Sequence, residues 1–305
     1  MSRIHEALKK AAEQRAPAAT DTPAPSILDV VPQVPVQRPA AILEDVKHSS
    51  PVMKPVESTV PPSFEQISSR CVHPEWTLDP RFSVFTGLES DHSSAERFRT
   101  LRSRLSQARD TRPLKKILVT SSIPAEGKSF IASNLAQSFV RQADRRVLLI
   151  DADLRAPRLH TALGAPPTPG LTEYLRGEAN EYQVIQQGRD QNLCFIPYGS
   201  EVSDPSELLS HERMRRLMEI VSPAFDWIIL DSPPVLPVHD ASILADLCDG
   251  VLFVVRAGAT ESVLAEKAVS EFRQKNLLGV VLNGTSRADS YGGYYETEYK
   301  TSFAL

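Results

Sequence analysis

The most constraining feature of this sequence is an alternation of short apolar runs with segments of helical pattern, beginning at about residue 93. A helix is predicted first, because Ser93 to Glu96 have the pattern of a capping box and Phe98, Leu101 and Leu105 continue an apolar stripe. Six strand-like runs follow: Ile117–Thr120, Val147–Ile150, Leu193–Ile196, Trp227–Leu230, Val251–Val255 and Val280–Leu282. Buried strands that alternate with helices predict an α/β fold with a doubly wound, mostly parallel sheet.

The rest of the chain is predicted to be appended to this domain. We expect a short amphipathic helix at 1–16, a Pro-rich disordered linker at 17–62, an irregular lead-in at 63–92, the folded domain at 93–287 and a flexible tail at 288–305. The N-terminus lacks the uninterrupted apolar region of a secretory signal, and no apolar run approaches the ~20 residues of a spanning helix. Membrane association is therefore expected only through a partner.

Composition excludes two classes of function. A formal net charge of −4 and a pI of about 6.0 give no electrostatic reason to expect a nucleic acid partner. The three cysteines, Cys71, Cys194 and Cys248, lie far apart without a CxxC pair, which argues against a metal or redox role.

A phosphate-binding loop is predicted between the first strand and the next helix. The run from Lys116 to Ser129 reads as strand, loop and helix, and it matches the pattern GxxxxGK[ST] except that Ser122 replaces the first glycine. Serine is tolerated there if its φ stays negative. Loop N–H groups can surround phosphates, Lys128 can reach the β/γ oxygens and Ser129 can ligate Mg²⁺, so Mg-ATP is the expected ligand. The expected contacts are Ser122, Pro124, Ala125, Glu126, Gly127, Lys128, Ser129 and Phe130.

Acidic side chains end two of the predicted strands. Asp151 and Asp153 follow one apolar run and Asp231 follows another, which places all three where ligands bind in parallel sheets. Mg²⁺ takes a few protein oxygens and keeps waters, so Ser129, Asp151 and Asp231 are the predicted metal ligands. Phosphoryl transfer also needs a base for the attacking hydroxyl, and Asp151 or Asp153 can supply it.

These motifs together carry a family resemblance. Residues 121–129, 148–155 and 228–234 resemble the Walker A, A′ and B motifs of bacterial tyrosine kinases, the autokinases of capsule and exopolysaccharide systems. The likeness covers roughly residues 90–300 and implies a P-loop NTPase fold of the deviant Walker type, similar to MinD and ParA. Ala125 departs from the family, in which Gly is often found before the Glu of the loop. The first eight residues are similar to the N-terminal helices of exosortase-associated members.

The resemblance implies an oligomer that phosphorylates itself. Glu96, Arg99 and Arg102 match an ExxRxxR motif that joins neighbouring subunits of such kinases into a ring, although a local Glu96–Arg99 pair explains the same spacing. The tail resembles the tyrosine cluster that such kinases phosphorylate in trans. Its tyrosines are Tyr291, Tyr294, Tyr295 and Tyr299.

Two site residues keep alternative interpretations. Arg155 could hold a phosphate or pair with a nearby acid, and Asn283 could meet the adenine edge or cap a turn. The resemblance also implies partners: a separate membrane polysaccharide co-polymerase as activator and a tyrosine phosphatase. The expected location is cytoplasmic, at the inner membrane through that co-polymerase.

Two other functions remain open at this point. One is a switch ATPase of the MinD/ParA type, but Ile123 stands where such proteins have their signature lysine. The other is an ATP-binding scaffold of a polysaccharide export complex, which the Ala125 departure and the short tyrosine cluster keep open.

Overall fold

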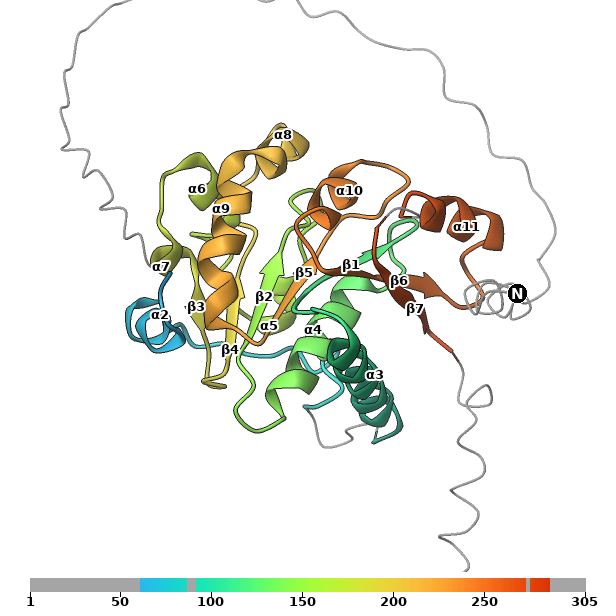
Figure 1. Cartoon of the computed structure of the whole chain (residues 1–305), viewed down its shortest axis with the longest axis horizontal. Helices are drawn as coiled ribbons and strands as arrows, with labels where there is room; N and C mark the ends of the chain where they lie inside the picture. The colour runs from blue at the N-terminus through green and yellow to red at the C-terminus, as the bar shows by residue number, and fades with distance from the viewer. Residues whose placement is uncertain (1–60, 87–91, 273–274, 286–305) are drawn as a thin grey trace, which may run out of the picture. The chain divides into compact units, whose positions relative to one another are not determined.

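The computed structural model describes residues 61–86, 92–272 and 275–285 (Figure 1). The segments expected to be the N-terminal helix, nearly all of the Pro-rich linker and the tyrosine-rich tail lie outside the described residues. The described ranges contain the predicted phosphate loop and all six predicted strands.

A seven-stranded sheet organises this domain, in the order β3-β4-β2-β5-β1-β6-β7. All neighbouring strands are parallel except β3 and β4, which are antiparallel. The strands are β1 (Lys116–Ser121), β2 (Val147–Asp151), β3 (Gln186–Gln187), β4 (Leu193–Ile196), β5 (Trp227–Asp231), β6 (Gly250–Arg256) and β7 (Leu277–Asn283). The six predicted strands and the doubly wound, mostly parallel sheet are confirmed. The two-residue β3 was not predicted, because a pair of glutamines carries no apolar signal.

Helices cover both faces of the sheet and enclose two separate cores. One core lies under α3 (His92–Thr111), α4 (Lys128–Val140) and α5 (Leu159–Leu163). The other lies under the remaining helices, which are α2 (Phe64–Arg70), α6 (Leu171–Arg176), α7 (Glu181–Val184), α8 (Pro205–Ser210), α9 (Glu212–Val221), α10 (Asp240–Ala245) and α11 (Ser262–Ser270). The 3₁₀ turn η1 (Ser222–Ala224) follows α9.

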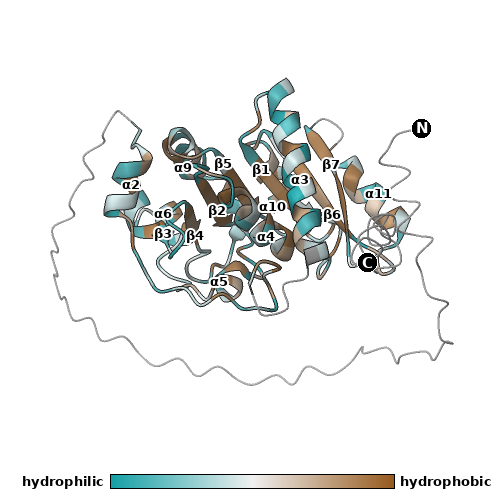
Figure 2. Ribbon diagram, turned by 90° about the horizontal axis from the view of Figure 1, so that it is seen from below, coloured by the Kyte–Doolittle hydropathy of each residue, from teal (hydrophilic) through white to brown (hydrophobic). Residues whose placement is uncertain are grey.

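Alternation along the strands divides the apolar side chains between these cores. In β1, Ile117 and Val119 face the α3/α4 core while Leu118 faces the other, and β2 alternates in the same way. All three of these β1 side chains are fully buried. Figure 2 shows the consequence, a strongly apolar sheet between helices with polar outer faces. Burial on both faces explains why the strands read as continuous apolar runs in the sequence.

The predicted irregular lead-in at 63–92 requires a correction, because residues 64–70 form helix α2. Ser63 and Gln66 make a reciprocal capping box, a helix-start signal that the sequence itself contains. Phe64 packs edge-on against Phe225 at 5.6 Å, so this helix belongs to the core. Irregular chain follows it and carries Trp76 onto Phe195. Helix α3 begins at His92, so Ser93 lies inside the helix and is not the N-cap that the predicted capping box requires.

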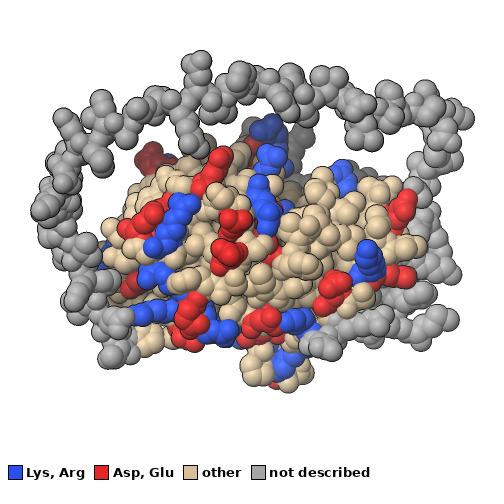
Figure 3. Space-filling model, turned by 90° about the horizontal axis from the view of Figure 1, so that it is seen from above, with Lys and Arg blue, Asp and Glu red and all other residues tan. Residues whose placement is uncertain are grey.

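Charged side chains of both signs lie on the surface of the domain (Figure 3). Positive and negative side chains alternate over the face seen in Figure 3, without an extended region of one sign. None of the helices in the described ranges is long and apolar enough to cross a bilayer.

Candidate functional site

The predicted phosphate loop connects β1 to α4. Gly127 is the N-cap of α4 and has a φ of 96°, a conformation that favours glycine. A Cβ atom at Gly127 would also lie 2.1 Å from Nδ2 of Asn283, so a larger residue would displace that side chain. The loop thus delivers the first N–H groups of a 13-residue helix to one point, the geometry that binds phosphate.

Two departures from the usual loop sequence have different physical outcomes. In the described part of the chain, Ala125 and Asp144 are the non-glycine residues with positive φ, at 66° and 59°. Ser122 therefore keeps the negative φ that was required of it. Ala125 instead occupies a left-handed conformation that costs a residue with a Cβ about 1–2 kcal/mol.

Lys128 and the three predicted carboxylates meet at the carboxyl ends of β2 and β5. Asp151 and Asp231 are register partners across these strands, and both are fully buried. Nζ of Lys128 lies 2.7 Å from Oδ2 of Asp153. The other oxygen of Asp153 accepts the N–H groups of Arg155 and Ala156, at 3.3 and 3.0 Å. Asp153 is thereby held in place on both sides.

Asp151 and Asp231 are far less satisfied. Oδ2 of Asp151 accepts the N–H of Leu159 at 3.1 Å, but its Oδ1 and both oxygens of Asp231 have no hydrogen-bond partner of good geometry among the described residues. Burial raises the pKa of Asp231 to about 7, against the opposing effects of Lys128 and the Ser129 hydroxyl. Burial, and then Asp231, also raise the pKa of Asp151 well above its usual range. Burial alone would lower the pKa of Lys128. The negative charges of Asp231 and Asp153 outweigh the effect of burial, so the pKa of Lys128 is raised.

These unpartnered oxygens fit a cation. Within the described ranges, no group of three or more His, Cys, Asp or Glu side chains forms a ready-made metal site. Mg²⁺ does not need such a group, since it takes one or two carboxylates together with waters and substrate phosphates. Buried acidic oxygens without donors are costly unless a ligand uses them.

Side chains from β6, from the loop after β6 and from β7 brace the phosphate loop. Glu126 is buried and accepts hydrogen bonds from Thr260 Oγ1 at 2.5 Å and from the N–H of Ile123 at 2.8 Å. Arg256 donates to the carbonyl of Ala125 at 3.0 Å. Asn283 donates to the carbonyl of Glu126 at 2.9 Å, and its Oδ1 accepts the N–H of Gly284 at 2.9 Å, so its amide both holds the loop and caps the turn after β7. Thr260 and Arg256 were not predicted, since only the fold brings them to the loop.

Of the two roles considered for Arg155, holding a phosphate or pairing with an acid, the structure shows the pairing with an acid. Its Nε lies 2.8 Å from Oδ2 of Asp240, a fully buried carboxylate at the start of α10. Its Nη2 reaches Oδ1 of Asp240 at 3.1 Å and Ser206 Oγ at 2.9 Å. Nothing local in the sequence marked Asp240 or Ser206.

Several other predicted residues occupy defined positions. Pro124 is exposed on the loop, and the ring of Phe130 packs 6.0 Å from that of Phe98, so only its backbone can reach a phosphate. Glu96 and Arg99 form an exposed pair at 2.8 Å, as the local interpretation of the motif requires. Arg102 donates to the carbonyl of Ser138 on α4 at 2.6 Å.

The fold and this loop define the class: an α/β P-loop nucleotide-binding protein. A family model described as an AAA domain matches residues 115–267, which contain the loop and all three carboxylates. The P-loop fold implies that the site binds a nucleotide.

Comparison with known proteins gives the family. The chain is 38% identical over 220 residues to the tyrosine-protein kinase YwqD of Bacillus subtilis, covering 71% of this chain and 92% of that one. It is 34% identical over 238 residues to the tyrosine-protein kinase ptk of Acinetobacter johnsonii, of which the match covers only 32%. The chain belongs to the bacterial tyrosine kinase family.

Solved structures agree. The kinase domain of the Escherichia coli tyrosine kinase ETK superposes with a TM-score of 0.60 at 33% identity, covering 67% of this chain and 84% of that one. The chimerical protein CapA2B2 superposes with a TM-score of 0.64 at 27% identity, covering 74% of this chain and all of that one. The predicted family and the P-loop α/β fold are thereby confirmed.

Proposed function

We propose that this chain is an ATP-dependent protein-tyrosine autokinase that regulates capsule or exopolysaccharide polymerisation or export. The observation that carries the proposal is the cluster of Lys128, Asp151, Asp153 and Asp231 around the phosphate loop, with buried acidic oxygens left for a ligand. The pathway is suggested by the sequence resemblance and by a relative from Klebsiella pneumoniae, 32% identical over 180 residues, described as a kinase in a cps region.

Charge neutralisation at the phosphates is the first task of the site. Lys128 would leave or share Asp153 to meet the β/γ oxygens, while the loop N–H groups bind the remaining phosphate oxygens. Mg²⁺ would be held by the Ser129 hydroxyl, Asp231 and Asp151, and would supply further positive charge. Phe130 is expected to contribute its backbone, because its half-buried ring packs against the α3/α4 core.

Transfer requires a base close to the attacking phenol. The tyrosine oxygen forms a bond to the γ-phosphorus, the bond from that phosphorus to the β,γ-bridging oxygen breaks, and ADP leaves with the electron pair. The phenolic proton passes to Asp151 or Asp153. Asp153 becomes available when Lys128 turns to the phosphates, and Asp151 has an Oδ1 without a hydrogen-bond partner among the described residues, so either can take the proton.

The acceptors are proposed to be the tail tyrosines Tyr291, Tyr294, Tyr295 and Tyr299 of a neighbouring copy, phosphorylated in trans within a ring. The exposed Glu96–Arg99 pair is available to such a neighbour, whereas Arg102 already serves its own α4. A membrane co-polymerase as activator, a tyrosine phosphatase, and a cytoplasmic location at the inner membrane complete the proposal. The N-terminal segment at 1–16 and its linker are the proposed contact with the activator, and 93–287 remains the proposed kinase core.

The test is the appearance of phosphate on the tail. Purified chain incubated with Mg-ATP and an activator segment is expected to gain mass in steps of one phosphate, on peptides that contain the tail tyrosines. Asp151→Asn should abolish the gain, whereas Asp190→Asn, an exposed carboxylate elsewhere, should not. Accumulation of ADP without labelled tyrosine would instead identify a switch ATPase.

A further inference from the structure

A cavity of ≈ 350 Å³ is lined by residues that directly follow Asp153 in the chain and includes no residue of the phosphate loop. We propose that it is the acceptor pocket, which receives the phenol ring of a tyrosine from the segment 290–299. This inference rests on the proposed kinase function and adds to it the place where the acceptor binds.

Position is the first argument. Leu154, Arg155 and Pro157 form one wall of the cavity, and they directly follow Asp153 in the chain. The backbone of this wall is hydrogen-bonded to Asp153, whose other oxygen contacts Lys128 at 2.7 Å. A ring seated against the wall therefore lies next to the groups that would hold the γ-phosphate.

The lining matches an aromatic side chain with a polar tip. Leu154, Pro157, Tyr198, Val202 and Pro205 supply flat and apolar surface, and the remaining lining residues are polar. Aromatic rings pack well on such surfaces, and pockets of this size hold one ring with its flanking atoms. The cavity is too polar at its rim to be a gap in the core.

The walls are held rigid before any ligand arrives. Arg155 is fixed by the buried Asp240 and by Ser206, which joins the wall to α8 and α10, neighbours in Figure 1. The ring of Tyr198 lies 5.3 Å from that of His160, and the Tyr198 carbonyl accepts the N–H of Thr172. Pre-formed walls reduce the entropy lost on binding.

One nitrogen of Arg155 offers a contact to the tail of this chain, although Glu201 also lines the cavity with the opposite charge. Arg155 uses Nε and Nη2 within the domain, and Nη1 is the nitrogen that would contact an acceptor carboxylate. The segment 290–299 places Glu296 and Glu298 among its four tyrosines. When a tyrosine enters the cavity, its ring would pack on the apolar lining. A glutamate next to it in the sequence would contact the guanidinium of Arg155.

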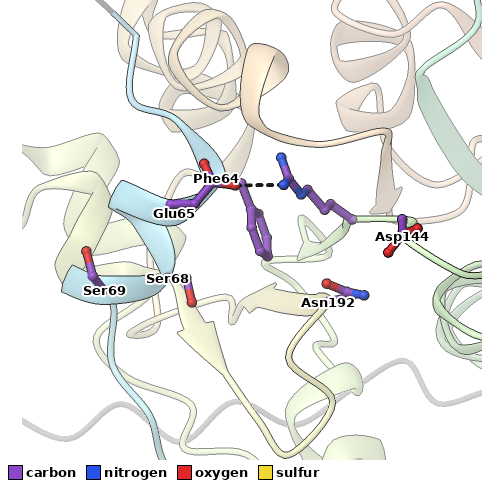
Figure 4. A pocket seen from close by; sticks show the side chains of 7 residues that line it. Phe64, Glu65, Ser68, Ser69, Asp144 and Asn192 are labelled. Atoms are coloured by element: carbon purple, nitrogen blue, oxygen red, sulfur yellow. Dashed lines mark hydrogen bonds and ion pairs between the residues drawn. The ribbon is translucent and has the colours of Figure 1, made fainter.

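A second cavity provides an internal control. It has a similar volume, ≈ 370 Å³, and lies at the amino ends of the strands, where Glu65 pairs with Arg146 at 2.7 Å (Figure 4). Ser203 and Ser69 are exposed serines that line the first and the second cavity, respectively. Tryptophan at either position would fill its cavity with the same bulk.

The experiment compares Ser203→Trp with Ser69→Trp in the full-length chain, with the four tail tyrosines replaced by alanine and a synthetic peptide of residues 290–299 as acceptor. Ser203→Trp is expected to raise the KM for the peptide at least about tenfold, while ATP affinity stays the same. Ser69→Trp should change neither. Tyr198→Leu, which removes one flat wall, should raise the peptide KM about fivefold and serves as the second variant if the first folds poorly.

Two outcomes separate this inference from the proposed function. A peptide KM that is unchanged in Ser203→Trp and Tyr198→Leu, with normal transfer, overturns the pocket and leaves the kinase intact. If no version of the chain transfers phosphate, the kinase proposal fails, and fluorescence anisotropy of the labelled peptide still decides the pocket. Equal peptide affinity in wild type and Ser203→Trp would then overturn it.

Discussion

The two ends of the strands carry the same kind of side chain in opposite roles. At the amino ends, Asp249 accepts the N–H groups of Lys115 and Lys116 at 2.8 Å each, and Asp226 accepts that of Arg146 at 3.0 Å. At the carboxyl ends, Asp151 and Asp231 keep oxygens without a hydrogen bond of good geometry in the part of the chain that the structure describes, although the Ser129 hydroxyl lies close enough to Asp231 to lower its pKa. Carboxylates surrounded by backbone donors stabilise the fold, whereas those without donors cost stability and are kept for a ligand.

Lys128→Met should produce the largest effect at the carboxyl ends. Without the ammonium group, the phosphates lose a buried positive charge, and tail phosphorylation should fall by a factor on the order of 100 or more. The fold should persist, because methionine fills a similar volume. Mass spectrometry of the tail measures the loss, and Lys267→Met, at an exposed lysine of α11, is the matched control. Retained labelling in Lys128→Met would contradict the site.

Asp249→Ala tests the opposite end. Two backbone donors would lose their acceptor, so the free energy of unfolding should fall by about 2–4 kcal/mol. Denaturant unfolding measures this change, and phosphorylation at a permissive temperature should remain near wild type. Asp249→Asn keeps an acceptor and should recover most of the loss. If Asp249→Ala lost phosphorylation activity but kept the free energy of unfolding of the wild type, the two strand ends would not differ in the way described.

Asp231→Asn should reveal the cost of a carboxylate without donors. The pKa of Asp231 is about 7 in the folded chain and near 3.8 when unfolded, so the folded state binds more protons between these values. Stability of the nucleotide-free protein should therefore be highest below pH 4 with respect to this group, and should fall as pH rises to about 7. Asn removes that dependence.

Thermal unfolding without magnesium or nucleotide checks this expectation. At pH 8 the Asn variant should be more stable than wild type by on the order of 1–3 kcal/mol, and at pH 4 the two should be nearly equal. Asp190→Asn should show no such difference. A variant less stable than wild type at pH 8 would mean that Asp231 contributes to the fold in the way that Asp249 does.

The smallest expected effect concerns backbone strain. Ala125, in the phosphate loop, and Asp144, at the amino-end cavity, both have positive φ. Aspartate tolerates this conformation far better than alanine does. Ala125→Gly should therefore relieve strain in the folded chain, while glycine also increases the entropy of the unfolded chain. The sum of both effects should stabilise the fold by up to about 1 kcal/mol, whereas Asp144→Gly should not stabilise it. Equal shifts in calorimetry would show that the loop stores no strain.

Sequence pattern predicted what local chemistry determines. The six apolar strands, the loop and the three carboxylates follow from runs of neighbouring residues, and all lie where the pattern indicated. Helix α2 could have been predicted from Ser63 and Gln66. The braces could not: Thr260 contacts Glu126 from 134 residues away, and Asp240 meets Arg155 from 85 residues away. Such pairs exist only after the sheet order is set.

The amide of Asn283 gives the phosphate loop an unexpected neighbour. It holds the carbonyl of Glu126 from the last residue of β7, and the chain then continues through Gly284 toward the tyrosine-rich segment. The end of the last strand and the phosphate loop are therefore tied together by one amide side chain. If the segment after β7 is captured by a partner, we expect a pull on it to reach the nucleotide site through Asn283.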